Sequence, residues 1–164
     1  FEGTIADNVA YGLRYEVGAE PAPAERRAAA AAAVDELGLT DWVEGMPRGL
    51  DSSVGQRGES LSAGERQLVA IARAHLAGGD LLVLDEATSA VDPATEVRIA
   101  QALERLTAGR STLTIAHRLS TAEAADLVVV VDEGEVVQVG PHSELVASEG
   151  IYAQLYGAWV AQTR

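Results

Sequence analysis

The sequence lacks cysteine entirely, and all 12 of its basic residues are arginine, so it has no lysine either. Without cysteine the chain has no disulfide, no thiolate zinc site and no cysteine nucleophile, which is typical of a protein of a reducing compartment. Long hydrophobic runs are also absent. The longest runs of large apolar residues, Leu81–Leu84 and Leu127–Val131, are far shorter than the ~20 residues that a membrane-spanning helix needs.

Positive charge is scarce as well. Acidic residues number 25 against 12 basic ones, which gives a formal net charge of −13. Such a charge disfavours a nucleic-acid groove or a basic membrane-binding patch, so we expect no nucleic-acid partner. Apolar residues make up 48% of the chain and charged residues 23%, values of a globular protein. The 164 residues suit one domain or a large part of one.

The first half of the chain is expected to be helical. Thr4 is placed to cap a short helix, with Asp7 in its first turn. A helix rich in alanine follows and is expected to end at Gly38, and the glycine-rich stretch Glu44–Gly58 is expected to be a loop. A further helix is expected over Leu61–Leu76, because its apolar residues recur at helical spacing on one buried stripe.

The second half has the pattern of an α/β fold. Leu81–Leu84 reads as a buried parallel strand, and Asp92 with Pro93 opens a helix that runs to Thr107. In that helix four residues are expected to face inward, namely Val97, Ala100, Leu103 and Leu106. Further elements are expected at 111–116 (strand), 120–125 (helix), 127–131 (strand) and, after a hairpin turn, 135–139 (strand). Alternating strands and helices predict a parallel sheet core. The C-terminal residues from Ile151 have the apolar spacing of a docked helix.

Two adjacent acids follow the strand at Leu82–Leu84. Ligands bind at the carboxyl ends of parallel strands, and successive residues diverge, so Asp85 and Glu86 can have different tasks. Asp85 is suited to hold Mg²⁺, and Glu86 to accept a proton from an attacking water or to position it. The alternative is a solvated acidic pair at the end of a strand.

The segment Leu61–Glu65 opens the helix expected over Leu61–Leu76. Free amides at a helix start, with the Ser62 hydroxyl and the small Gly64 beside them, can bind an anion. The same residues also form a capping box, because Glu65 follows Ser62 by three positions. Capping alone explains this spacing more often, and the two interpretations are compatible.

The positions of the three histidines in the sequence indicate different roles. His117 ends the second strand at the sheet edge where Asp85 and Glu86 also lie, which favours a functional role. His75 and His142 have no such neighbours and are expected to be structural.

Together these motifs resemble the nucleotide-binding domain of ATP-binding cassette (ABC) transporters. Leu61–Glu65 is similar to the family's signature motif Leu-Ser-Gly-Gly-Gln, and Leu81–Glu86 to its Walker B strand with the catalytic glutamate. Ser89–Asp92 resembles the D-loop and His117 the switch histidine. Further segments are similar to the exporter branch, namely Phe1–Ile5 with Asn8, Val54–Gly58, Thr114–Thr121 and Gly140–Leu145.

The resemblance implies a partial P-loop NTPase (RecA-like) α/β fold, a parallel sheet core with an α-helical signature subdomain. Residues 1–78 would form the end of the glutamine-loop region and the helical subdomain, and residues 79–164 the C-terminal part of the core. In this family two such domains meet head to tail with ATP between them, on the cytoplasmic face of a membrane and against a transmembrane domain. ATP and Mg²⁺ are the implied cofactors.

The resemblance also implies a role for each site residue. Ser62 and the Gly64 amide would contact the γ-phosphate of ATP held by the other subunit, and Ala63 and Glu65 belong to the same ATP-contacting motif. Asp85 would support Mg²⁺ as its ligand. The catalytic residues would be Glu86, acting on the water, and His117, holding the γ-phosphate, while Asp92 would bridge the interface. Positioning and charge stabilisation of this kind are what phosphoryl transfer needs.

The sequence departs from the family in four places. The phosphate-binding loop Gly-x-x-x-x-Gly-Lys-Ser/Thr is absent, so the chain is expected to be a C-terminal fragment of the domain that alone neither binds nor hydrolyses ATP. Ala63 replaces a glycine, which is tolerable if its φ is negative, and Glu65 replaces a glutamine. Gln56 stands where exporters often have glutamate, in the loop that contacts the membrane domain.

Two alternatives to an exporter motor domain are kept open. One is a soluble ABC-type ATPase of DNA repair or translation, which the acidic charge disfavours. The other is a truncated, non-functional fragment that exposes apolar sheet surface normally covered by other parts of the domain.

Overall fold

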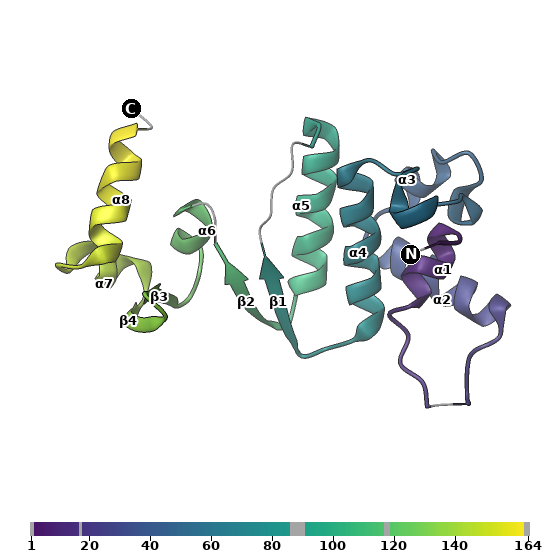
Figure 1. The fold of residues 1–164 in the computed structure, drawn as a ribbon, viewed down its shortest axis with the longest axis horizontal. Coiled ribbons are helices and arrows are strands. Elements are labelled where there is room, and N and C mark those ends of the chain that lie inside the picture. Colours follow the sequence, from purple (N-terminus) through teal and green to yellow (C-terminus); the bar gives the residue numbers. More distant parts are fainter. Residues whose placement is uncertain (1, 17, 86–90, 117–118, 163–164) are drawn as a thin grey trace. The chain divides into compact units, whose positions relative to one another are not determined.

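The computed structural model describes residues 2–16, 18–85, 91–116 and 119–162. Figure 1 shows the arrangement of elements within each part of the chain. The helices are α1 (Ile5–Ala10), α2 (Pro23–Glu36), α3 (Thr40–Glu44), α4 (Ala63–Ala77), α5 (Pro93–Thr107), α6 (Leu119–Glu123), α7 (His142–Ala147) and α8 (Ile151–Gln162), with short 3-10 turns η1 (Gly49–Asp51) and η2 (Gln56–Gly58). The strands are β1 (Leu81–Asp85), β2 (Ser111–Ile115), β3 (Val128–Asp132) and β4 (Glu135–Gly140).

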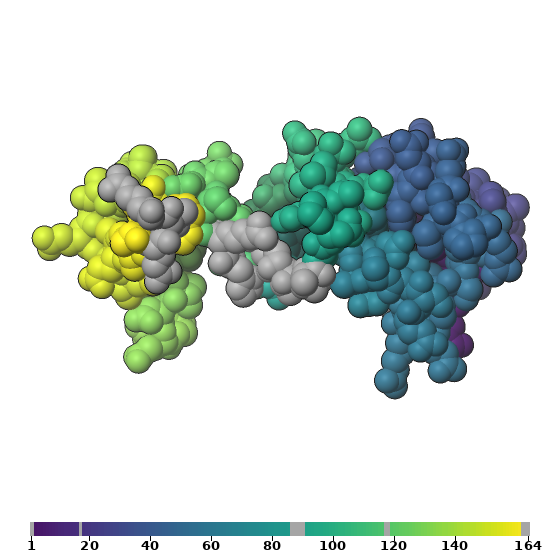
Figure 2. Space-filling view, turned by 90° about the horizontal axis from the view of Figure 1, so that it is seen from above, coloured from purple at the N-terminus to yellow at the C-terminus, as the bar shows by residue number. Residues whose placement is uncertain are grey.

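The chain divides into two compact units. Unit 1 comprises residues 1–83 and 88–113, and unit 2 comprises residues 84–87 and 114–164. Figure 2 shows the surface of unit 1 mainly in purple to teal and that of unit 2 mainly in green to yellow. The domain boundary that the sequence places after residue 78 stays a prediction.

Unit 1 is a helical layer built around α4. Helices α1, α2 and α5 all contact α4, and α2 also contacts α1. Ala30 and Ala33 of α2 are almost completely buried. Because their side chains are small, α2 can pack closely against its neighbouring helices. The largest side chains of this core that are fully buried are Ile5, Val9, Leu37, Leu39, Leu68 and Leu106. The buried stripe predicted on the helix over Leu61–Leu76, which is α4, is confirmed for Leu68, Ile71 and Ala72.

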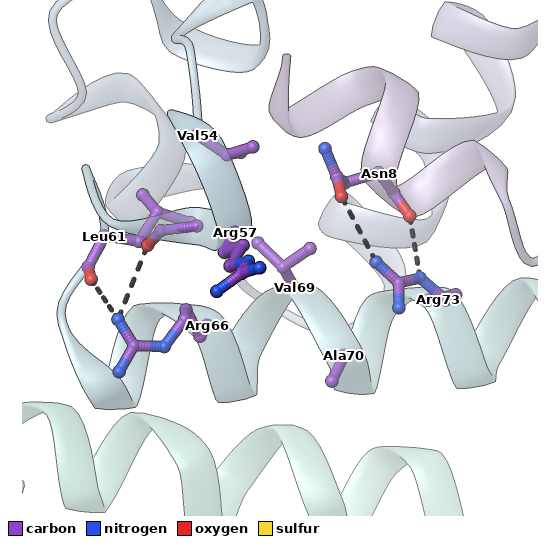
Figure 3. Close-up of a pocket in the computed structure, with 9 residues that line it drawn as sticks. Asn8, Val54, Arg57, Leu61, Arg66, Val69, Ala70 and Arg73 are labelled. Atoms are coloured by element: carbon purple, nitrogen blue, oxygen red, sulfur yellow. Dashed lines mark hydrogen bonds between the residues drawn. The ribbon is translucent and has the colours of Figure 1, made fainter. Parts of the chain in front are cut away.

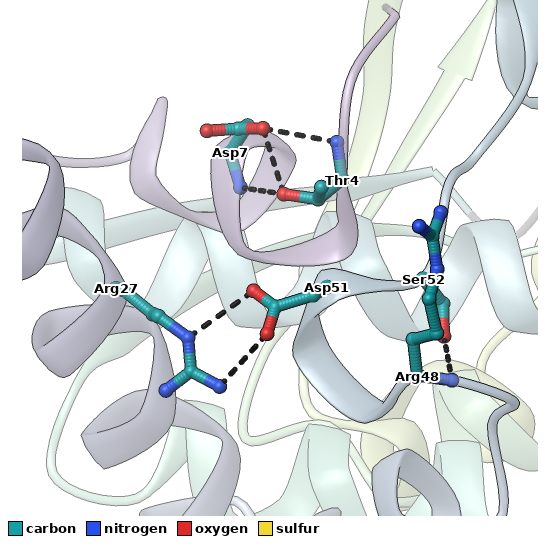
Figure 4. Close-up of polar contacts among 6 residues, drawn as sticks. All are labelled: Thr4, Asp7, Arg27, Arg48, Asp51 and Ser52. Carbon is teal, nitrogen blue, oxygen red and sulfur yellow. Dashed lines mark hydrogen bonds and ion pairs between the residues drawn. The ribbon is translucent and has the colours of Figure 1, made fainter.

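Polar contacts stabilise the start of α1 and join α2 to η1 within this layer, as Figure 4 shows. The predicted cap of α1 is confirmed: the Asp7 amide donates to Thr4 Oγ1 over 3.1 Å, and the Thr4 amide donates to Asp7 Oδ2 over 3.0 Å. The Thr4 hydroxyl and amide lower the pKa of the Asp7 carboxyl. Arg27 on α2 donates two hydrogen bonds of 3.1 Å to the Asp51 carboxylate, which ties α2 to η1.

The strands form two separate two-stranded sheets. β1 pairs with β2, and α5 connects them, which is the βαβ arrangement of an α/β fold. The predicted hairpin is confirmed: β3 pairs antiparallel with β4, and the turn residues Glu133 and Gly134 both have positive φ. The α/β class is therefore confirmed. The expectation that the strand at 127–131 belongs to the parallel core stays a prediction, since the pairing of β3 with β4 is the predicted hairpin itself.

Burial of β1 also differs from the prediction. Leu82 is buried, but Leu81 and Val83 are 61% and 62% exposed. The continuous apolar run predicted a strand covered on both faces. In this chain one face of β1 stays open, since alternate residues of a strand point to opposite sides.

The predicted inward face of α5 is partly wrong. Leu106 is buried, and Leu103 is partly buried against the core, but Val97 is 57% exposed and Ala100 is exposed. The helix carries a second apolar stripe, and it is this stripe, with Ile99 and Ala102, that packs against α4. Helical periodicity identifies both stripes without deciding which one is covered.

The two histidines predicted to be structural have partners within the fold. His75 Nε2 lies 2.6 Å from Glu36 Oε2, and His142 Nδ1 lies 2.8 Å from the Tyr152 hydroxyl. Tyr152 is buried, so α8 docks on α7 through it, while Leu155 of α8 remains 56% exposed. Within the described ranges, every helix is too short or too polar to span a bilayer.

Candidate functional site

The first turn of α4 is an exposed, capped helix tip. The Glu65 amide donates to Ser62 Oγ over 3.2 Å, and the Ser62 amide donates to Glu65 Oε2 over 2.7 Å. This is the predicted capping box. Ser62 is exposed, and because its oxygen accepts the hydrogen bond from Glu65, its own hydroxyl proton stays available to an external acceptor.

The fold accommodates both residues of this tip that differ from the signature motif, Ala63 and Glu65. Ala63 is the first residue of α4, and the described non-glycine residues with positive φ are Arg57 and Glu133, so the methyl group of Ala63 meets no backbone strain. The Glu65 carboxylate turns back to the Ser62 amide and is held there. The amides of Ala63 and Gly64, in the first turn, have no acceptor within the helix by its geometry. The tip therefore combines a hydroxyl donor with amide donors, the chemistry of an anion contact.

Gly64 is buried where α4 meets α5. A Cβ atom at this position would lie 2.5 Å from Thr95 Cγ2 and 2.8 Å from Val91 Cγ1, closer than side chains tolerate. Glycine is required here by this close approach, since the backbone of α4 rests directly on the start of α5. The two helix starts thus lie against each other.

Asp92 caps α5 at this contact. Its Oδ1 accepts a hydrogen bond of 3.0 Å from the Thr95 amide. The Thr95 amide, followed by the Thr95 hydroxyl, holds the pKa of Asp92 below its usual value, so Asp92 is ionised at neutral pH. The structure therefore brings together four of the predicted site residues, Ser62, Ala63, Gly64 and Glu65, with Asp92 of the adjacent helix.

The other predicted site residues are placed as follows. Asp85 is exposed at the last position of β1, the carboxyl end of the strand where the sequence predicted it. Glu86 and His117 lie outside the described residues. Among the residues that the structure describes, no three histidine or acidic side chains gather in a metal-binding group.

A second feature, a pocket of about 170 Å³, lies between α1, the Val54–Gly58 loop and α4. Figure 3 shows three arginines along it, Arg57, Arg66 and Arg73. Arg66 Nη1 donates to the Leu61 carbonyl over 2.6 Å, and Arg73 Nε donates to the Asn8 carbonyl over 2.9 Å. Burial lowers the pKa of the Arg73 guanidinium.

Sequence reasoning missed Arg66 and Arg73, although their spacing of seven residues places them on one face of α4. Arg57 is exposed and has a left-handed backbone (φ 53°), a conformation that costs energy in a residue other than glycine. The pocket is thus a local positive site on a strongly acidic chain.

The capping box gives a prediction about stability. Ser62→Ala removes the acceptor of the Glu65 amide and is expected to lower the free energy of unfolding by about 1 kcal/mol. Glu65→Gln keeps an acceptor for the Ser62 amide and is expected to change it by less than about 0.5 kcal/mol. Thermal and denaturant unfolding measure both, with Ser60→Ala as the control at a neighbouring exposed serine. A Ser62→Ala protein as stable as the Ser60→Ala protein contradicts the role of the cap.

Comparison with known proteins defines the class to which this arrangement belongs. The family model described as ABC transporter matches residues 2–89, more than half of the chain. The chain belongs to the ABC transporter family.

The particular proteins to which the chain is similar include flippases and an exporter. The chain is 49% identical to the ATP-dependent lipid A-core flippase of Bordetella pertussis (strain Tohama I) over 95% of its own length and 24% of the relative's. It is 47% identical to the flippase of the same name from Vibrio cholerae serotype O1, over 95% of this chain and 25% of that one. Among solved structures, a bacterial Atm1-family ABC exporter with ATP bound is similar with a TM-score of 0.76 and 38% identity, over 97% of this chain and 26% of that chain. The chain spans about a quarter of the length of these proteins.

Proposed function

We propose that this chain is part of the ATP-hydrolysing motor domain of an ABC exporter, which drives a substrate across a membrane. The observation that carries the proposal is the start of α4, where the exposed Ser62 caps the helix beside the Asp92-capped start of α5. The family membership, the similarity to an ATP-dependent flippase and the similarity to an ABC exporter structure support the same function.

In the proposed site the α4 tip acts on a nucleotide held by a second, identical or similar domain in a head-to-tail dimer. The Ser62 hydroxyl and the amides of Ala63 and Gly64 donate hydrogen bonds to the γ-phosphate. Glu65 keeps these donors in place because its carboxylate is held at the Ser62 amide, 2.7 Å away. Asp92 faces the dimer interface as an ionised group, because the hydrogen bonds from Thr95 favour its charged form.

The residues at the end of β1 suit Mg²⁺ bound together with nucleotide. Magnesium in such sites is held by one or two carboxylates and by substrate phosphates, so the exposed Asp85 is a sufficient protein ligand, directly or through water. Mg²⁺ held there would neutralise charge on the phosphates. Glu86 accepts a proton from the attacking water or orients it, and His117 contacts the γ-phosphate.

The transmembrane domain of the transporter is the second proposed partner, with this domain on the cytoplasmic face of the membrane. The arginine-lined pocket supports a contact at the Val54–Gly58 loop, because it is a positive, partly apolar hollow on an acidic protein. Gln56 lies in the same loop and is exposed there.

A nucleic-acid-associated ABC ATPase is the weaker candidate. The net charge of −13 opposes contact with a phosphate backbone, and the similar proteins reported above are flippases and an ABC exporter.

The experiment that tests the proposed function compares two proteins, the full-length protein that carries this sequence and the 164-residue chain alone. The full-length protein, reconstituted in lipid vesicles, is expected to hydrolyse ATP in the presence of Mg²⁺ and to move substrate only when ATP is supplied. The chain alone is expected to give no ATP signal by calorimetry, because it has no lysine for the phosphates. A full-length protein without ATPase activity, or tight ATP binding by the chain alone, contradicts the proposal.

A further inference from the structure

A single side chain joins the two halves of the site that unit 1 contains. Thr95, in the first turn of α5, has two groups at its β-carbon, and each contacts a different motif. Its methyl group, Cγ2, lies where it would be 2.5 Å from any Cβ at Gly64. Together with the Thr95 amide, which donates a hydrogen bond of 3.0 Å to Asp92 Oδ1, its hydroxyl lowers the pKa of the Asp92 carboxyl.

These two contacts restrain one another. A β-branched side chain at a helix start has few rotamers, so Thr95 cannot turn its hydroxyl away from Asp92 without moving its methyl away from Gly64. Gly64 has no side chain that could adjust its position. The α4 backbone itself therefore packs directly against Thr95 and Val91. A displacement of Asp92 is therefore passed to the α4 tip through one rigid unit.

We infer that Thr95 is a positioning residue that couples Asp92 to the Ser62–Gly64 tip, so that both are presented to the partner domain in one fixed geometry. This inference rests on the proposed function, since it assigns a role within the proposed dimer site. Thr95 acts through its two neighbours and is not itself expected to contact nucleotide. Serine or valine at this position keeps only one of its two contacts.

Two substitutions separate the contacts in the full-length protein. Thr95→Val keeps a methyl group against Gly64 and removes the hydroxyl from Asp92, so kcat for ATP hydrolysis is expected to fall about threefold to tenfold, with a smaller change in KM. Thr95→Ser keeps the hydroxyl and removes the methyl support, so the α4 tip loosens and KM for ATP is expected to rise about threefold to tenfold. Thr107→Val and Thr107→Ser, at the last residue of the same helix, are the matched controls and are expected to stay within about twofold of the wild type.

The measurements are steady-state ATPase kinetics and Tm for each protein. The inference is supported if Thr95→Val mainly lowers kcat and Thr95→Ser mainly raises KM, with Tm values of both variants close to that of the wild type. Thr95 variants within about twofold of the wild type in both parameters overturn it, as does an equal loss in both parameters that follows a fall in Tm. An inactive wild-type protein contradicts the proposed function instead, so the two failures are distinguishable.

Discussion

Glu86→Gln in the full-length protein is expected to abolish ATP turnover and to leave ATP binding intact. The two side chains have nearly the same shape, but the amide carries no negative charge and cannot accept a proton from the attacking water. General base catalysis contributes about 10²- to 10⁴-fold to rates, so a loss of at least about 100-fold is expected. The measurement is ATPase activity beside equilibrium binding of ATP with Mg²⁺.

The control for this substitution is the same replacement at another glutamate. Glu104→Gln makes the same chemical change at an exposed position of α5 and is expected to leave turnover within about twofold of the wild type. Undiminished hydrolysis by the Glu86→Gln protein removes Glu86 from the catalytic role. Loss of turnover together with loss of ATP binding points to a role in binding and contradicts the one proposed.

Gly64→Val is expected to be the second most damaging change, and the structure gives the reason. The first added carbon already comes within 2.5 Å of Thr95 Cγ2 and 2.8 Å of Val91 Cγ1. Both neighbours are β-branched and cannot rotate away cheaply, so the starts of α4 and α5 must separate. Overpacking of this kind costs about 1–3 kcal/mol, and the Ser62 hydroxyl moves with the helix start. ATP turnover is expected to fall by about 10- to 100-fold, the rate equivalent of about 1.4 to 2.7 kcal/mol.

A double substitution tests whether this contact is the cause. Thr95→Ser removes the methyl group that the new side chain meets, so Gly64→Ala with Thr95→Ser is expected to unfold at a higher temperature than Gly64→Ala alone. Gly157→Val on α8 is the control, because a Cβ there meets no atom within 4 Å. Additive losses in the double variant contradict the direct contact between Gly64 and Thr95.

The parts of the fold that were predictable are those fixed by local physics. The caps at Thr4, Ser62 and Asp92 depend on side chains that bond amides three positions later, and all three are confirmed. The turn at Glu133 and Gly134 depends on backbone preference and is confirmed in the same way. Such features need no information from distant parts of the chain.

The parts that were not predictable depend on contacts between distant residues. Periodicity showed that α5 is amphipathic, but Val97 is exposed while Ile99 is buried, because the position of α4 decides which stripe is covered. The apolar run Leu81–Leu84 indicated burial, yet burial depends on what lies over each face of β1. The contact between Gly64 and Thr95 has no sequence signal either, since a glycine in a helix start has several explanations.

The candidate site, like the fold, was predicted only in part from the sequence. The tip of α4 was predicted both as a cap and as an anion contact, and the structure shows the cap, with the hydroxyl proton of Ser62 left available. The pocket between Arg57, Arg66 and Arg73 was missed, because these residues come from a loop and a helix that only the fold brings together. Its charge supports the proposed contact with a transmembrane domain.

The central claim is that the α4 tip of one subunit completes the ATP site of another. The most direct test is disulfide cross-linking in a cysteine-free full-length protein with Ser62→Cys and one cysteine in its lysine-containing phosphate loop. With ATP and Mg²⁺ in a Glu86→Gln background, the account predicts a cross-link between two subunits, seen as a dimer band on a non-reducing gel, from Ser62→Cys of one subunit to the loop of the other. A cross-link confined to a single chain, or none when ATP is bound, contradicts it.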